Sequence, residues 1–257
     1  MNLFVRKVAI KLARAREHGT FISKIPLKKI RNLNVATSIC REAEHQIMWD
    51  PIGFKAGATN KSVWKKLKVP KPFFSFLYNE KTAKSGSKVT FQNNLLGAEL
   101  EVAFKIKNEV FFTKNKITKK NVSRFIIGIA PALEIVGFRQ KINNIDCLGR
   151  MISDFGLNVY FITGKIIKYS FKKINNIRTQ IINKKNKKIF IGNTKLVLGN
   201  PLNSLIWLLN EIKKNKIYLS FDFWVTSGST TPIVKLKCGD DIEGAIPGLG
   251  KVTAKFI

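Results

Sequence analysis

Short segments rich in β-branched and aromatic residues, with turn-forming residues between them, fill most of the chain after about residue 90. Side chains of these types pack well on a pleated sheet, so we expect the segments to be strands. Residues 183–187 have the composition of a hairpin turn between two of them. The expected strands are Glu99–Phe104, Phe125–Ile129, Leu133–Phe138, Val159–Ile162, Ile177–Ile182, Lys188–Ile191 and Ile217–Val225.

Three further segments carry apolar residues at helical spacing. The first is Val5–Arg16, and the second, with looser spacing, runs from about Ile30 to Ile47. The third is the best marked, because Asn200 can cap its N-terminus and Pro201 fits its first turn. The apolar face expected for this third helix consists of Leu202, Leu205, Ile206, Leu209 and Ile212.

Nothing in the sequence marks a domain boundary, since it has no repeat, low-complexity tract or Pro/Gly/Ser-rich linker. We therefore expect one α+β domain over residues 1–257, with a helical N-terminal portion at 1–50 and a β-rich portion at 51–257. No apolar run reaches the roughly 18 to 20 residues that cross a bilayer, because Pro131 and Glu134 interrupt the longest one. A membrane span is therefore not expected.

The three cysteines, Cys40, Cys147 and Cys238, lie far apart and form no C-x-x-C pair. This spacing argues against a disulfide framework or a structural zinc site, and a reducing cytoplasm fits it best. The basic N-terminal segment is either the first helix of the domain or a transit peptide. Glu17 and the uninterrupted continuation of the chain favour the helix.

The charge balance is strongly basic, with 46 Lys+Arg against 16 Asp+Glu and a formal net charge of +30. Such a charge suits nucleic acid or an anionic surface. The lysines are spread along the whole chain, however, and no RNP-like motif, helix-turn-helix pattern or basic tail accompanies them. We expect a solvated basic surface without a specific nucleic-acid site, whose field attracts small anionic substrates.

Three carboxylates stand out because acids are scarce in this chain. Glu99 and Glu101 are two residues apart, so on a strand both point to one face, and paired like charges need a neutralising partner. Glu134 lies in an apolar segment where an unpaired carboxylate is costly. An exposed acidic strand face would explain the first pair, and an ion pair with Arg124 or Arg139 would explain Glu134. A divalent cation bound by all three is the alternative, because Mg²⁺ and Mn²⁺ prefer oxygen ligands.

Several segments resemble the 2-keto-4-pentenoate hydratases of the fumarylacetoacetate hydrolase superfamily. Residues 53–59 are similar to the family's G-x-K-x-G-x-T segment, 99–104 to its E-x-E-L-A-F strand, and 131–136 to P-A-L-E-I-V. Residues 198–210 resemble L-G-x-P-L-N…W-L-x-N, and 227–231, 239–240 and 249–252 add further matches. Their order and approximate spacing hold over nearly the whole chain.

This resemblance implies a β-rich, fumarylacetoacetate-hydrolase-like mixed β-roll or sandwich with N-terminal helices. It implies that Glu99, Glu101 and Glu134 bind Mg²⁺ or Mn²⁺ and that Lys55 moves protons during keto-enol tautomerisation. Glycines on both sides of Lys55 suit a loop that a ligand can approach closely. The substrate-binding residues implied by the same matches are Thr59, Asp154, Ser227, Ser229 and Thr230.

The chain also departs from the family pattern. Phe73 stands where the family usually has the acid of P-D-F-G, Gly137 replaces the acid of D-S-R, Phe155 replaces the asparagine of D-N, and Asn200 replaces a frequent histidine. The expected ligands are retained while polar residues around them are changed. We therefore expect these changes to affect the water-addition reaction more than metal binding.

The activity implied by the resemblance is that of a hydro-lyase of aromatic catabolism, which adds water to a 2-hydroxy-2,4-dienoate to give a 4-hydroxy-2-oxo acid. The alternatives on the same site are a 2-oxo-diacid decarboxylase of the 4-oxalocrotonate type, an acylpyruvate hydrolase and a non-catalytic paralogue. The hydrolase is disfavoured because the two histidines, His18 and His45, lie in the expected N-terminal helices. We expect a cytoplasmic homo-oligomer, or pairing with a homologous subunit.

Overall fold

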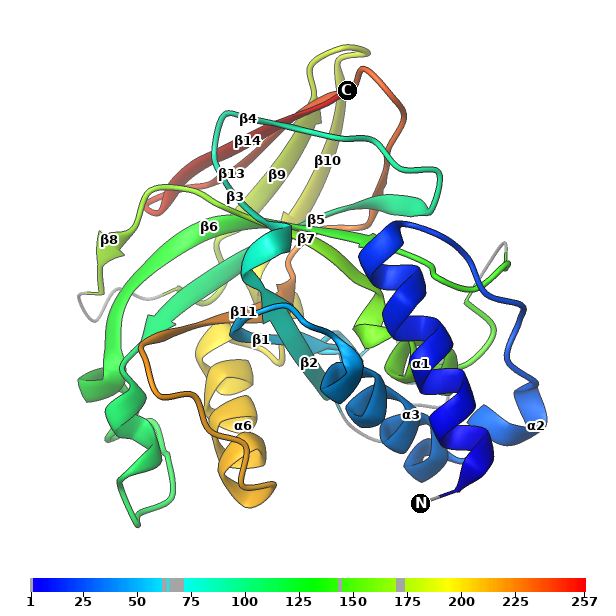
Figure 1. Ribbon diagram of the computed structural model, residues 1–257. Helices are drawn as coiled ribbons and strands as arrows, with labels where there is room; N and C mark the ends of the chain where they lie inside the picture. Colours follow the sequence, from blue (N-terminus) through cyan, green and yellow to red (C-terminus); the bar gives the residue numbers. More distant parts are fainter. Residues whose placement is uncertain (1, 62–63, 65–71, 143–144, 170–173) are drawn as a thin grey trace.

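The computed structural model describes residues 2–61, 64, 72–142, 145–169 and 174–257, and Figure 1 traces them. The fold is α+β, as expected. The helices are α1 (Leu3–His18), α2 (Leu27–Ile30), α3 (Leu33–Gln46), α5 (Leu148–Ser153) and α6 (Pro201–Lys214). The strands are β1 (Pro51–Gly57), β2 (Phe73–Tyr78), β3 (Thr82–Lys84), β4 (Ser87–Val89), β5 (Leu95–Ile106), β6 (Ile126–Gly137), β7 (Asn158–Thr163), β8 (Ile167–Lys168), β9 (Arg178–Asn183), β10 (Lys188–Asn193), β11 (Phe223–Ser229), β12 (Val234–Lys235), β13 (Asp241–Ile246) and β14 (Gly250–Phe256).

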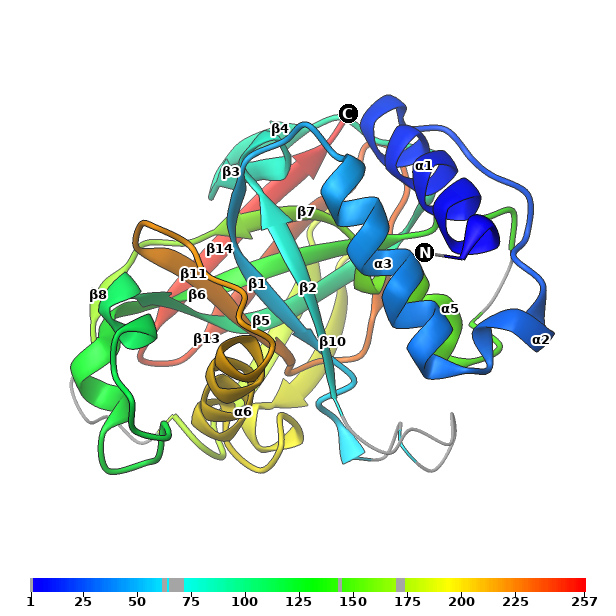
Figure 2. The same cartoon turned by 60° about the horizontal axis from the view of Figure 1, so that its bottom comes forward.

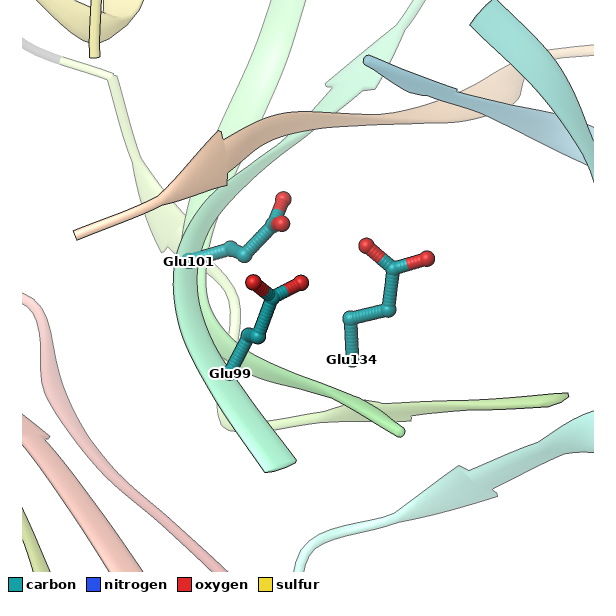
Figure 3. A group of neighbouring side chains, drawn as sticks. All are labelled: Glu99, Glu101 and Glu134. Atoms are coloured by element: carbon teal, nitrogen blue, oxygen red, sulfur yellow. The ribbon is translucent and has the colours of Figure 1, made fainter. Parts of the chain in front are cut away.

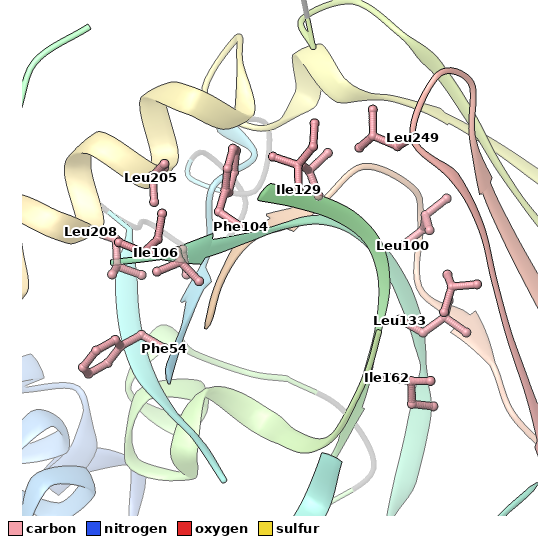
Figure 4. Packing of buried hydrophobic residues seen from close by; sticks show 14 of the residues in the cluster. Phe54, Leu100, Phe104, Ile106, Ile129, Leu133, Ile162, Leu205, Leu208 and Leu249 are labelled. Carbon is pink, nitrogen blue, oxygen red and sulfur yellow. The ribbon is translucent and has the colours of Figure 1, made fainter. Parts of the chain in front are cut away.

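The strands of the described residues form two sheets. The first has the order β2-β1-β11-β5-β6-β7-β3, with β12 beside β5 and β8 beside β6, and the second has the order β10-β9-β13-β14-β4. Strands β5 and β6 are twelve residues long, pair antiparallel over nearly their full length and curl strongly (Figure 4). Their curvature gives this pair a convex face and a concave face.

The convex face of β5 and β6 holds the main hydrophobic core. Leu100 on β5 and Leu133 on β6 are register partners, are fully buried and point toward the second sheet (Figure 4). Phe104, farther along β5, packs in the same cluster with Leu205 and Leu208 of α6. Because side chains alternate along a strand, Glu99, Glu101 and Glu134 are left on the concave face.

The N-terminal helices form a separate layer against the first sheet. Helix α1 packs on α3, and α3 packs on α5 (Figure 2). Asn2 caps the start of α1, and Gly19, at φ +65°, ends it in a left-handed conformation. None of the helices that the structure describes is long and apolar enough to cross a bilayer.

Most expected elements are confirmed, and Asn200 caps α6 as its sequence indicated. The helix expected over about Ile30–Ile47 is divided into α2 and α3. The strand expected at Ile217–Val225 begins only at Phe223. The reason is that the backbone carbonyl of Ser220 and the side chain of Asp222 accept hydrogen bonds from Asn108, so this stretch serves as a loop contact.

The two strands expected at Phe125–Ile129 and Leu133–Phe138 are one continuous strand, β6, which runs through Pro131. A proline donates no backbone hydrogen bond and usually interrupts a central strand. Here the carbonyl of Pro131 accepts a hydrogen bond from the Gly164 N–H. The nitrogen and the carbonyl of one residue face the same side of a strand, so the Pro131 nitrogen faces the edge of β6 that pairs with β7 and β8. At Pro131 this edge lies between the segment paired with β7 and the segment paired with β8. No strand pairing is lost at that point.

Candidate metal centre

Three glutamates meet on the concave face of β5 and β6. Glu99 and Glu101 are two residues apart on β5, and Glu134 on β6 is the direct register partner of Glu99. Figure 3 shows the three side chains extending from the two strands toward a common centre. One oxygen from each carboxylate lies within 4.8 Å of the other two. This spacing allows one cation to contact all three.

The charges of this cluster are poorly compensated. Glu134 is fully buried and Glu101 is 1% exposed. Burial, followed by the charge of Glu134, raises the pKa of Glu99 to about 7, and burial together with Glu134 and Glu99 raises the pKa of Glu101 well above its usual range. Glu134 Oε2 is buried without a hydrogen-bond partner among the described residues. A hard divalent cation fits this donor set, because it would neutralise the charges and satisfy the free oxygen.

Lys55 provides an ammonium beside the carboxylates. Its Nζ lies 3.1 Å from Glu134 Oε1 and donates to the Gly156 carbonyl at 3.0 Å. Burial acts to lower the pKa of Lys55, but the charge of Glu134 and then those of Glu99 and Glu101 outweigh it and raise the pKa. Lys55 is therefore held as an ammonium. Glu134 is paired with this lysine rather than with Arg124 or Arg139, the ion-pair partners considered from the sequence.

The segment around Lys55 is strand β1 and not the loop expected from its glycines. β1 lies between β2 and β11. A Cβ at Gly53 would lie 2.0 Å from the Trp224 carbonyl oxygen, so this glycine permits close packing of β11. Gly57 in the same way accommodates the ring of Phe73, which stands 5.7 Å from Lys55 Nζ. Strand packing explains both glycines.

A cavity of about 530 Å³ opens above the carboxylates. Lys55, Glu99 and Glu101 supply the charged part of its lining. Thr59 and Ser229, both expected to bind substrate, also contribute to its wall. The apolar part of the lining consists of Val136, Ile145, Met151, Leu157, Ile191, Leu196, Pro232 and Ile233.

The other residues expected to bind substrate lie outside the described lining of this cavity. Asp154 is fully buried and pairs with Arg139. The Thr230 hydroxyl donates to the Leu100 carbonyl at 2.7 Å, which ties the end of β11 to β5. Ser227 is buried on β11 rather than in a loop, and its hydroxyl has no hydrogen-bond partner among the described residues.

Gly228 fixes one of the carboxylates through its backbone. Its N–H donates to Glu101 Oε2 at 2.8 Å. The residue has φ +107°, and a Cβ there would lie 1.8 Å from Thr59 Oγ1. Only glycine fits this position without strain. The S-G-S segment therefore orients Glu101 as well as forming part of the wall.

Two contacts to the site had no signal in the sequence. Asn158, at the start of β7, donates from Nδ2 to Glu134 Oε1 at 3.0 Å. The Gly156 carbonyl accepts from Lys55, and Gly156 itself has φ +61°. Neither residue belongs to a pattern that marks it, because both act from a turn whose conformation depends on packing against Phe73 and Phe155.

Comparison with known proteins identifies relatives of this chain by sequence. No family model matches the chain. It is 28% identical to the TodF product hydratase of Pseudomonas putida strain F1 over 207 residues, which are 80% of this chain and 76% of the relative. It is 26% identical to 2-keto-4-pentenoate hydratase 1 of Dechloromonas aromatica over 206 residues, 80% of this chain and 77% of that protein.

Solved structures share the fold. The 4-oxalocrotonate decarboxylase from Pseudomonas putida G7, complexed with magnesium and adipate, superposes with a TM-score of 0.85 at 20% identity, over 100% of this chain and 98% of that one. The fumarylpyruvate hydrolase from Pseudomonas aeruginosa, in complex with Mn²⁺ and pyruvate, gives 0.61 at 12% identity over 80% and 89%. The expected fold is thereby confirmed. In sequence the chain is thus similar to 2-keto-4-pentenoate hydratases, and in fold it is similar to the 4-oxalocrotonate decarboxylase and the fumarylpyruvate hydrolase.

Proposed function

We propose that this protein is a metal-dependent hydratase that adds water to a 2-hydroxy-2,4-dienoate and forms a 4-hydroxy-2-oxo acid. The observation that carries the proposal is the cluster of Glu99, Glu101 and Glu134, two of which line a cavity, with the Lys55 ammonium directly beside it. The hydratase relatives support the reaction class.

Glu99, Glu101 and Glu134 would hold Mg²⁺ or Mn²⁺ through carboxylate oxygens. Bound there, the cation would supply Lewis-acid chemistry to the carboxylate and 2-oxygen of the substrate. The chain prepares the ligands for this role, since Gly228 N–H orients Glu101 and Asn158 orients Glu134. Magnesium and manganese in the solved neighbours support the choice of metals.

Lys55 would move the proton that converts the dienol into an unsaturated ketone. Its raised pKa means that it starts as an ammonium, so it can donate to the terminal carbon of the diene and regain the proton that the 2-hydroxyl loses as the ketone forms. Water then adds across the remaining double bond, with oxygen bound to the carbon that is β to the ketone. Thr59 and Ser229 line the cavity and would hydrogen-bond substrate oxygens, Ser229 in exchange for its bond to the Thr231 carbonyl.

The cavity favours a substrate with one carboxylate over a diacid. Lys55 is the only cationic side chain among the lining residues that the structure describes, and it is paired with Glu134. Much of the remaining lining is aliphatic, with side chains such as Ile145 and Met151. A second carboxylate against these side chains would lose hydration without gaining a cationic partner among the described lining residues. This contrast favours hydration over decarboxylation of a 2-oxo-diacid.

The direct test is turnover by the purified protein, loaded in turn with Mg²⁺ and Mn²⁺. The substrates are 2-hydroxypenta-2,4-dienoate, oxalocrotonate and an acylpyruvate, and the control is protein treated with a chelator. We expect metal-dependent loss of the dienoate absorbance with formation of the 4-hydroxy-2-oxo acid. Release of CO₂ from oxalocrotonate as the faster reaction would reassign the protein as a decarboxylase. Metal binding without turnover of any substrate would identify a non-catalytic paralogue.

A further inference from the structure

Arg16, in the last turn of α1, is buried without an acidic partner. It is 4% exposed, and none of the ion pairs of the described residues includes it. The rings of Phe155 and Tyr78 lie 4.7 and 5.0 Å from its guanidinium carbon. Burial, and next the charge of Arg139, lower the pKa of Arg16 to about 10. The charges of Asp154 and Glu44 act in the opposite sense but do not outweigh burial, so keeping this cation buried is costly.

Within the described part of the chain, the hydrogen bonds of the Arg16 side chain go to Asn158. Its Nη1 donates to the Asn158 backbone carbonyl and its Nη2 to Asn158 Oδ1, each at 2.9 Å. Arg139 also donates to that backbone carbonyl, at 2.7 Å. The contact that Arg16 alone provides is therefore the one to the side-chain amide.

This contact decides which way the amide of Asn158 points. A guanidinium only donates hydrogen bonds, so the amide atom that faces Arg16 has to be the oxygen. The amide nitrogen is then turned toward Glu134, where it donates to Oε1 at 3.0 Å. The reverse orientation would place Oδ1 against the carboxylate of Glu134, with two acceptors facing each other.

The orientation of Asn158 in turn decides how Glu134 presents its two oxygens. Oε1 accepts from Asn158 Nδ2 and is paired with Lys55 Nζ. Oε2 has no hydrogen-bond partner among the described residues, so it remains free for a cation shared with Glu99 and Glu101. Loss of the donor on Oε1 would allow the carboxylate to rotate.

We propose that Arg16 is a positioning residue for the metal centre, which acts through the side-chain amide of Asn158 to hold Glu134 with one oxygen free for the cation. This inference rests on the proposed function, because it assumes that Glu134 is a ligand. It makes α1, which packs on α3, a functional part of the site. Residues that orient metal ligands commonly change affinity by about 10- to 100-fold when they are replaced.

The test is calorimetric titration of the full-length protein with Mn²⁺ for Arg16→Met, Asn158→Ala and the double variant. We expect each single variant to lose about tenfold or more in affinity. The double variant should bind about as weakly as Asn158→Ala alone, since Arg16 has nothing left to orient. Arg14→Met is the matched control, because Arg14 is exposed on the same helix, and its affinity should equal that of the wild type.

Arg16→Lys covers the case in which Arg16→Met does not fold. A lysine keeps the buried charge but lacks the two-pronged geometry that binds the backbone carbonyl and Oδ1 together. Its Mn²⁺ affinity should lie between those of the wild type and Asn158→Ala. The positioning role would be overturned, with the metal site left standing, by either of two results. One is wild-type Mn²⁺ affinity in both folded variants, Arg16→Lys and Arg16→Met, and the other is additive losses in the double variant. Absence of Mn²⁺ binding by the wild-type protein would overturn the proposed metal site and this role with it.

Discussion

The two faces of the curled strands β5 and β6 have opposite chemistry although they are built from alternating residues of the same segments. The convex face carries Leu100 and Leu133 into the core, and the concave face carries Glu99, Glu101 and Glu134. Apolar burial stabilises the first face, whereas like charges opposite each other destabilise the second. The comparison indicates that the convex face maintains the fold and the concave face is kept for binding. Substitutions on the two faces should therefore have separable effects.

The largest expected effect is on turnover, from Lys55→Met. The variant removes the proton donor while leaving the three carboxylates in place, so turnover should fall by about 10²- to 10⁴-fold. Mn²⁺ affinity should not fall, because the ammonium competes with the cation for the charge of Glu134. Steady-state kinetics and calorimetry on one preparation measure both quantities. Turnover close to the wild-type rate would remove Lys55 from the chemistry.

The next largest expected effect is on stability, from a substitution on the convex face. Leu100→Ala removes a fully buried side chain from the core and should reduce the free energy of unfolding by roughly 2–5 kcal/mol. Urea denaturation measures this loss, and Mn²⁺ affinity of the folded variant should remain near that of the wild type. Ile189→Ala, at a side chain that is 58% exposed, is the control and should change stability little. A loss of metal affinity equal to that of a glutamate variant would contradict the separation of the two faces.

The elements that could be predicted from the sequence are those set by local rules. Asn200 and Pro201 define the start of α6 by capping and by a fixed φ. The two-residue spacing of Glu99 and Glu101 puts both on one face of β5, whatever the tertiary structure. The register that places Glu134 opposite Glu99 is not local. The family resemblance and the cost of an unpaired acid predict that Glu134 joins the other two, but they do not predict its register.

The features that the sequence did not reveal depend on contacts between distant segments. The glycines beside Lys55 are typical of a loop, yet they serve the close approach of β11 and Phe73 to strand β1. Pro131 is tolerated within β6 because its nitrogen faces a gap in the pairing. Arg16 has the position of an ordinary basic residue at a helix C-terminus, and only its contact with Asn158 connects it to the site.

A smaller effect concerns pH on the concave face. Burial and the charge of Glu134 raise the pKa of Glu99 to about 7 from an ordinary value of 4.5, and the pKa of Glu101 is also raised well above its ordinary value. The stability that protonated Glu99 contributes is present below about pH 4.5 and is lost as the pH rises through 7. A cation needs the ionised forms, so the increase in Tm on adding Mn²⁺ should be larger at pH 8 than at pH 6. Thermal unfolding with and without Mn²⁺ measures it, and an equal increase at both values would argue against ligation by these carboxylates.

The central claim is that the three concave glutamates form one divalent-metal site, and calorimetric titration of Glu101→Gln with Mn²⁺ tests it most directly. The substitution keeps the side-chain volume and removes one charged ligand. Glu109→Gln, at an exposed position, is the matched control and should bind as the wild type does. The account predicts that Glu101→Gln remains folded and loses at least about tenfold in Mn²⁺ affinity. The same affinity in the wild type and in Glu101→Gln would contradict it.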